Sequence, residues 1–200
     1  MTILPIAYMP SVRYFARILA GDCIIDTGEH FIKRSERNRT AILSPAGRAS
    51  FTVRVEHADR PRTPVRDVRI DYSGNWQHQH WTALVSYYRS SPYFDHYAPH
   101  LEPFYRRRFD HLADFDLELT RTLLHFIGLE LPPVSHDYVQ AADGDLDLRP
   151  KRAVDGAFRQ VEYFQVFSDR MPFVGELSFA DMLFCEGPGA KALLAESLRL

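Results

Sequence analysis

The chain has 200 residues, 46% of them hydrophobic and 13% aromatic, which is enough apolar material for one domain with its own core. Its 24 Lys and Arg and 26 Asp and Glu residues give a formal net charge of −2. This balance excludes attraction of the whole surface to nucleic acid or to anionic membranes, so any site for a polyanion must be local.

The start of the chain does not have the pattern of a signal peptide. Residues 1–6 carry no basic segment, and Pro5 and Pro10 interrupt the early apolar stretch before it could span a membrane. We therefore expect a cytoplasmic protein with no membrane insertion. Cys23 and Cys185 lie beside apolar residues without metal-binding spacing, which favours two buried thiols.

Strand patterns dominate the first 70 residues. A helix is expected after Ser11, where Val12, Phe15, Ile18 and Leu19 recur at helical spacing. Residues 44–48 form a turn between two strands of a hairpin, and the polar residues 56–64 predict a surface loop. The segments expected to be strands are 2–8, 23–27, 40–43, 50–55 and 65–70.

From Ser73 onward the apolar period changes from two residues to about 3.6, which predicts helices. Trp76, His80, Leu84 and Tyr88 form one stripe of a helix that ends at the turn 90–92. The other expected helices are 112–127, closed by Gly128, and a final pair, 179–185 and 190–198, opened by Ser178.

The proline-rich and glycine-rich residues 132–159 predict a long irregular crossing. Arg106, Arg107 and Arg108 are interpreted as part of a helix surface, with side chains that reach along it to solvent. Together these patterns predict a single compact α+β domain over residues 1–200. In it, a mixed sheet from the N-terminal third packs against helices of the C-terminal two thirds.

His78 and His80 are separated by one residue, which suggests a metal site at first sight. On a helix this spacing points the two rings about 200° apart, and no third ligand has suitable spacing, so we expect no metal. His80 lies on the apolar stripe, where it is either a hydrogen-bonded core histidine or a general base facing a cleft. Asp71, at the end of the preceding expected strand, is the acid that could orient it.

Residues 33–39 concentrate four cations within seven positions. One interpretation is a solvated charge run on a loop. The other is a phosphate site, because guanidinium groups match phosphate oxygens with two parallel hydrogen bonds. The arginines Arg37 and Arg39 would then bind the phosphate.

Two further groups of residues permit a binding role. An aromatic wall could stack on a base or sugar, although core packing is the simpler explanation for most of its members, which are Tyr8, Tyr14, Tyr87, Tyr93 and Phe94. Ser178 is expected to cap a helix, and Asp181 follows at its third position, where an acid can also hold an arginine or a substrate hydroxyl. Motifs of serine hydrolases, P-loop NTPases and Rossmann dehydrogenases are missing from the sequence, and we expect no cofactor.

A series of ordered motifs extends along nearly the whole chain: Tyr8-Met9-Pro10, Tyr14-Phe15, Asn38-Arg39, residues 67–72, Asn75-Trp76, His80-Trp81, Tyr87, residues 91–94, residues 101–103, residues 147–151, residues 163–167, Asp169-Arg170, Leu177-Ser178, Asp181 and Leu183-Phe184. These motifs resemble those of the WbqC-like family, whose members often accompany genes for O-antigen and other surface polysaccharides. A family Gln-Pro before the first motif is replaced here by Ile6-Ala7, so no role of that glutamine transfers to this chain.

The resemblance implies a transferase of surface-polysaccharide or O-antigen (lipopolysaccharide) biosynthesis, which transfers an acyl or aminoacyl group to a nucleotide-linked sugar. In that hypothesis His80 and Asp71 remove a proton from the attacking group. The alternative is a non-catalytic binding or scaffold protein for other proteins of the pathway. The residues assigned to binding the nucleotide sugar, or another phosphorylated small molecule, are Tyr8, Tyr14, Arg37, Asn38, Arg39, Trp76, Tyr87, Lys151 and Asp181.

Overall fold

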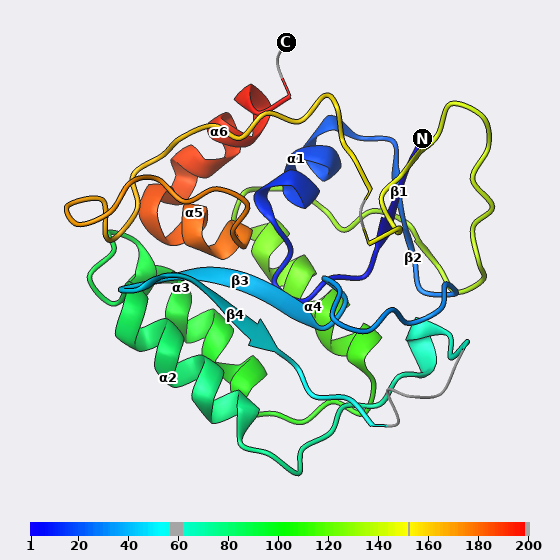
Figure 1. Cartoon of the computed structure of the whole chain (residues 1–200), viewed down its shortest axis with the longest axis horizontal. Helices are drawn as coiled ribbons and strands as arrows, with labels where there is room; N and C mark the ends of the chain where they lie inside the picture. The colour runs from blue at the N-terminus through cyan, green and yellow to red at the C-terminus, as the bar shows by residue number, and fades with distance from the viewer. Residues whose placement is uncertain (57–61, 152, 199–200) are drawn as a thin grey trace.

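The computed structural model describes residues 1–56, 62–151 and 153–198. Within these residues, a parallel sheet with the strand order β5-β2-β1-β6 lies beside the antiparallel pair β3-β4, and helices pack around both (Figure 1). The α+β class predicted from the sequence is therefore confirmed. Most of the expected surface loop 56–64 lies outside the described residues.

The centre of the parallel sheet is β1 (Thr2–Pro5), which pairs with β2 (Cys23–Asp26) on one side and β6 (Leu146–Asp147) on the other. Helix α1 (Val12–Ala20) connects β1 to β2, as predicted, and Ser11 caps it by accepting a hydrogen bond from the Tyr14 amide. The inner positions of these strands carry fully buried apolar side chains, Ile3, Leu4 and Ile25.

The crossing segment 132–159 is less irregular than expected. It supplies both edges of the parallel sheet, β6 beside β1 and β5 (Val134–Ser135) beside β2. Its close approach to the sheet needs a glycine at position 28, because a Cβ atom there would collide with the backbone of Asp137 and Tyr138. The crossing is thus part of the core architecture.

The predicted hairpin is confirmed as β3 (Arg39–Ser44) and β4 (Gly47–Thr52). The strand expected at 65–70 is wrong, because Val65–Asp67 forms the 3₁₀ helix η1, followed by isolated bridges at Arg69 and Ile70. The amides of Val65 and Arg66 donate to the carbonyls of Glu29 and Thr27, and these bonds hold the segment in a turn instead of a ladder.

The expected helices after residue 73 are present, together with α3, which the apolar period did not reveal. Arg106–Arg108 lie in a turn after η2 and not on a helix, although Arg107 and Arg108 stack on aromatic rings. The elements are α2 (Trp76–Tyr88), α3 (Phe94–Leu101), η2 (Glu102–Tyr105), α4 (Leu112–His125), α5 (Phe179–Glu186), η3 (Gly187–Gly189) and α6 (Ala190–Glu196).

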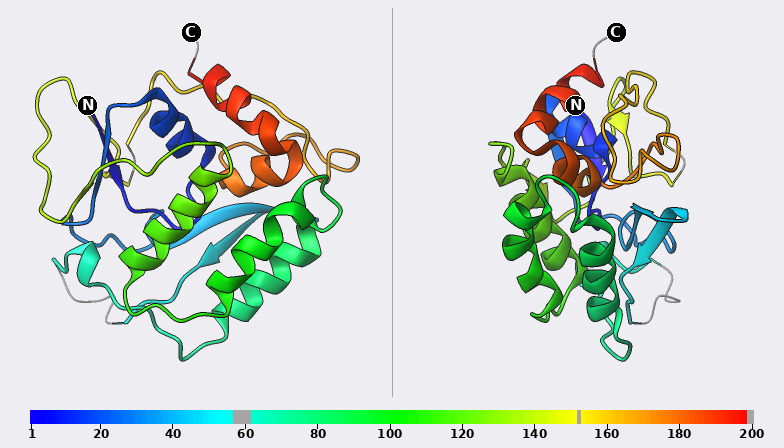
Figure 2. Two further views of the ribbon diagram at one scale, coloured as in Figure 1. Left: turned by 180° about the vertical axis from the view of Figure 1, so that it is seen from behind. Right: turned by 90° about the vertical axis from the view of Figure 1, so that its left-hand side faces the viewer.

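Buried side chains from both sheets and from the helices join in one hydrophobic cluster. The right-hand view of Figure 2 shows α2, α3 and α4 on one side of the β3-β4 hairpin, with α1, α5 and α6 above them. Phe15 of α1 stacks on Phe179 of α5 at 4.2 Å between ring centroids, which joins the helix after β1 to the C-terminal pair.

Asp181 is a buried polar centre of this core. Its Oδ1 accepts a hydrogen bond from Tyr88 at 2.7 Å, and its Oδ2 accepts bonds from Tyr163 at 2.7 Å and Gln165 at 3.1 Å. The Tyr88 hydroxyl in turn accepts a bond from the Leu43 amide of β3. One carboxylate therefore ties α5 to α2, to the hairpin and to the segment before α5.

Replacing Asp181→Asn should lower the free energy of unfolding by about 2–4 kcal/mol, because an amide offers one acceptor oxygen to three buried donors. Urea unfolding followed by circular dichroism measures this loss. The matched control is Asp169→Asn at an exposed position, where we expect a change of no more than about 0.5 kcal/mol. Equal stabilities of the two variants would contradict the role of Asp181.

Candidate functional site

A cleft with a volume of about 270 Å³ opens between the hairpin, the turn after β1 and the segment after β6. Phe158 contributes aromatic surface to it, and the fully buried Tyr8 lies in its wall. Its charged lining is strongly basic among the described residues, with six cations and two acids: Arg13, Arg34, Arg37, Arg39, Arg48, Lys151, Glu36 and Glu176. The cleft is therefore suited to an anion.

The topology explains why this cleft lies where it does. Strand β1 ends at Pro5 and leads to Tyr8, and strand β6 ends at Asp147 and leads to Lys151. Parallel neighbouring strands end at the same edge of a sheet, and ligands of open parallel sheets bind at this carboxyl edge. The Tyr8 amide donates to the carbonyl of Glu36 at 2.9 Å, which brings the basic segment 34–39 to the same edge.

Most of the cations of the cleft retain donors that no protein acceptor uses. Arg39 donates through Nε to Thr52 at 3.2 Å, and Arg48 reaches the Gly175 carbonyl at 3.4 Å. Arg13 reaches the carbonyl of Ala153 at 3.3 Å. Within the described residues, none of these three guanidinium groups forms an ion pair with a carboxylate, so their charge is available to a ligand.

Arg37 differs from the other cations because its donors already have protein acceptors. The side chain is fully buried, its Nε donates to Glu29 at 2.9 Å, and a second nitrogen also binds the Glu29 carboxylate. The remaining bonds reach the Ser35 hydroxyl at 3.1 Å and the Arg149 carbonyl at 2.8 Å. Arg37 therefore positions the basic segment, whereas the sequence suggested that it binds phosphate directly.

Glu36 is a feature of the cleft that sequence reasoning missed. Burial raises the pKa of its carboxyl, while Arg13 and Arg37 act in the opposite direction. It belongs to the charged run that the sequence did single out, but only the turn of the backbone at this run reveals which side chains face the cleft. An acid with a raised pKa beside cations is a candidate for accepting a proton.

His80 does not line the cleft and is only 6% exposed. Its Nδ1 shares a hydrogen bond of 2.9 Å with the hydroxyl of Tyr8, and its ring stacks on Phe51 at 4.4 Å between centroids. Burial lowers the pKa of the imidazole to about 4, so the ring is neutral near pH 7. These features match the core-histidine interpretation, with Tyr8 as the partner that a buried ring requires.

Asp71 has different partners from those expected. Its carboxylate accepts a bond from the Ser73 amide at 2.7 Å and pairs with Arg54 at 3.3 Å, and these interactions lower its pKa. The structure thus forms no hydrogen bond between Asp71 and His80. Asp71 instead lines a second hollow together with Arg69 and Arg108.

The other residues assigned to substrate from the sequence lie outside the cleft lining. The Tyr14 hydroxyl donates to the Pro5 carbonyl at 2.8 Å, and the Asn38 amide donates to Val53 at 2.9 Å. Trp76 donates to the carbonyl of Asp71, and Tyr87 is partly buried against the core. Asp181 is the buried centre described above.

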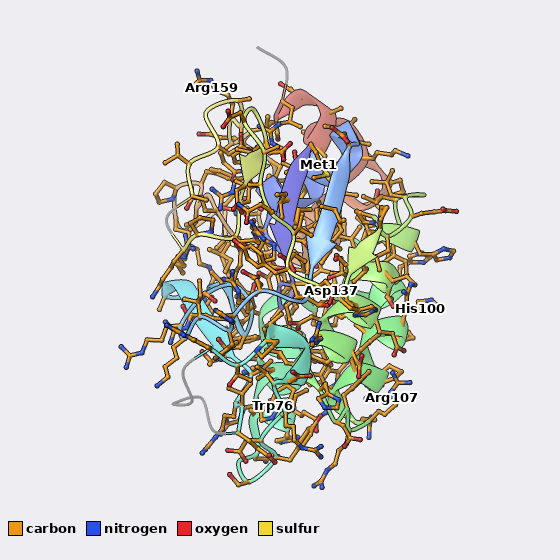
Figure 3. The ribbon with its side chains drawn as sticks, turned by 90° about the vertical axis from the view of Figure 1, so that its right-hand side faces the viewer. Met1, Trp76, His100, Arg107, Asp137 and Arg159 are labelled. Carbon is orange, nitrogen blue, oxygen red and sulfur yellow. The ribbon has the colours of Figure 1, made fainter. Side chains whose placement is uncertain are left out.

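Figure 3 places Trp76 in the lower, helical part of the molecule, far from Arg159 of the crossing segment at the upper end. Of the residues assigned to substrate, the structure therefore brings four to the cleft: Tyr8, Arg37, Arg39 and Lys151.

Two further observations concern metals and membranes. His78 is exposed and His80 is buried, as the helical spacing predicts, and the described residues hold no group of three or more His, Cys, Asp or Glu side chains that could bind a metal ion. Every helix among the same residues is too short or too polar to be a transmembrane helix. Cys23 and Cys185 are buried free thiols, as expected.

Comparisons with known proteins give a family but no activity. The model of the family described as "WbqC-like protein family" matches residues 6–157, which is more than half of the chain. The chain is 27% identical over 139 residues to "Uncharacterized protein Rv1507c" of Mycobacterium tuberculosis, an alignment that covers 68% of this chain and 60% of that protein. No solved structure matches the chain significantly.

The neutral state of His80 predicts a pH dependence of stability. Below its ordinary pKa of 6.5 the unfolded chain binds a proton that the folded protein excludes, so stability falls from about pH 6.5 to about pH 4 and this contribution is then constant. The loss from this group should approach about 3 kcal/mol. Urea unfolding of the wild type and of His80→Gln at a series of pH values gives their free energies of unfolding, and the difference between the two profiles is the contribution of His80.

The matched control for this experiment is His78→Gln, which removes an exposed imidazole from the same helix. Its pH profile should follow that of the wild type, whereas the profile of His80→Gln should be flatter between about pH 6.5 and pH 4. A His80→Gln profile parallel to that of the wild type would show that the imidazole titrates normally in the folded protein.

Proposed function

The chain belongs to the WbqC-like protein family, and we propose that its basic cleft binds a phosphorylated small molecule as the substrate of a transferase. The substrate that fits the family setting is a nucleotide-linked sugar of surface-polysaccharide or O-antigen biosynthesis, modified by acyl or aminoacyl transfer. We also propose the cytoplasmic location expected from the sequence. The observation that carries the proposal is the group of unpaired cations in one small cleft.

The size and charge of the cleft favour a small anion over a polymer. A volume of about 270 Å³ lies near the lower end of small-molecule pockets, and the net charge of −2 offers no extended basic surface to a nucleic acid. Arg39 has two terminal nitrogens without protein acceptors and can bind phosphate oxygens with both of them. Lys151 approaches from the crossing segment and would add a second positive charge.

The other parts of the lining provide what a sugar or base requires. Phe158 gives apolar surface next to the cations, on which a ring of the ligand can pack, whereas the Tyr8 ring is fully buried. The proton acceptor of the transfer is Glu36 in this proposal, because His80 faces Tyr8 in the core and Asp71 lies elsewhere. Glu36 takes the proton of the substrate's amine or hydroxyl as that group attacks the carbonyl carbon of an acyl thioester, and the bond from this carbon to sulfur breaks to release the thiolate.

Replacing Arg39→Ala should weaken the binding of UDP-glucose and of inorganic pyrophosphate about tenfold or more, because one charge-assisted pair of hydrogen bonds to phosphate is lost. Isothermal titration calorimetry measures the affinities. The matched control Arg121→Ala removes an exposed arginine of α4 that does not line the cleft, and its affinities should equal those of the wild type.

A thermal-shift panel of nucleotide sugars, pyrophosphate and acyl thioesters completes this test, since a ligand that binds the folded state raises the melting temperature. Silence of the wild type across the panel would reject the enzyme. If the same arginines were then required to capture a protein of the polysaccharide pathway, the scaffold alternative would replace it.

A further inference from the structure

The acids around the cleft differ in whether their carboxylates have hydrogen-bond partners in the protein. Glu29 binds Arg37 through both carboxylate oxygens, Asp155 binds Arg17, and Asp26 and Asp147 both bind Arg149. Glu36 lines the cleft among arginines, yet its carboxylate accepts no hydrogen bond from any described residue. Of these half-buried or buried acids, Glu36 is thus the one whose acceptor oxygens remain available to a ligand.

An unpaired carboxylate has a cost in a site for phosphate. Two unit charges of like sign a few ångströms apart repel by about 1 kcal/mol even in water, and by more where the protein excludes water. Glu36 also loses hydration because it is half-buried. A ligand offsets both costs if it places a hydrogen-bond donor with positive charge against this carboxylate.

We propose that Glu36 binds a free amino group of the ligand, and that the ligand of the cleft is therefore a phosphorylated amino sugar, with phosphate at Arg39, Arg48 and Lys151. The proposal rests on the proposed function and narrows its substrate class. A cleft with separate acceptor and cation positions matches a molecule that carries both an ammonium group and phosphate. Such a molecule satisfies Glu36 without leaving the arginines unpaired.

The proposal requires the cleft to separate charge along its length. Arg13, the cation that interacts with Glu36 most strongly, is held at the start of α1 and is anchored to the Ala153 carbonyl. Arg39 and Arg48 belong to the facing strands β3 and β4 of the hairpin. Glu36 itself lies on the segment that leads into the hairpin, so the acid and the cations of the cleft come from different elements.

A matched pair of ligands tests the inference. UDP-glucosamine and UDP-glucose differ by an amino group in place of a hydroxyl, and pyrophosphate carries the anion alone. The wild type should bind UDP-glucosamine about tenfold more tightly than UDP-glucose, the worth of one charge-assisted hydrogen bond. Glu36→Gln should abolish this preference, while its affinity for pyrophosphate should rise about three- to tenfold because a repelling charge is removed.

The matched control is Glu130→Gln, which removes an exposed negative charge that does not line the cleft. It should leave all three affinities and the preference as in the wild type. The opposite effects of Glu36→Gln on the amino ligand and on pyrophosphate separate a contact with the amine from general loss of structure, because a misfolded variant would weaken both.

The two proposals fail in different ways. If pyrophosphate does not bind to the wild type, or binds equally to Arg39→Ala, the phosphate site and the inference built on it are both rejected. If pyrophosphate binds and depends on Arg39, but the wild type shows no preference for UDP-glucosamine or Glu36→Gln retains that preference, the phosphate site stands and the role of Glu36 is rejected.

Discussion

The arrangement of the cleft depends on a buried ion network at the carboxyl edge of the parallel sheet. Asp26, the last residue of β2, accepts bonds from the amides of Gly28, Glu29 and Val139 and pairs with Arg149, which follows β6. Arg37 binds Glu29 and the Arg149 carbonyl. Buried charges are stable only when their hydrogen bonds are satisfied, so this network fixes the segments that carry Glu36, Arg39 and Lys151 relative to the sheet.

Local pattern predicted the hairpin and every α-helix except the short α3, while long-range pairing determined the strands that it missed. The stripes in α2 and α4 extend over more than three turns, and such a period is difficult to produce by chance. Strands β5 and β6 have two residues each, which is too short for any alternation to appear. Residues 65–70 have the composition of a strand, but the bonds that the Val65 and Arg66 amides donate to the carbonyls of Glu29 and Thr27 impose a turn on their first half.

The candidate site was predictable as a charged segment but not as a set of roles. The cation run at 33–39 indicated the region that lines the cleft, and Lys151 came from the family resemblance. The sequence could not show that Arg37 turns inward, because its partner Glu29 is identified only by the folded backbone. Arg48 sits beside the hairpin turn and Arg13 beside the start of α1, so their approach to the cleft follows from tertiary packing and leaves no local signal.

The charge of the whole chain and the charge of the cleft have opposite signs, and this contrast is informative. A formal charge of −2 is spread over the surface, where salt screens it within about 8–10 Å. Among its described lining residues, the cleft has five cations without a buried partner and only two acids, Glu36 and Glu176. The concave protein wall has a lower dielectric constant than water, which strengthens the local electric field. Attraction of an anion therefore acts at short range, and it selects for a ligand small enough to enter the cleft. Under the proposal made for Glu36, the single half-buried acid within this field is the group that would distinguish one anion from another, because a carboxylate favours a ligand that carries positive charge at one position.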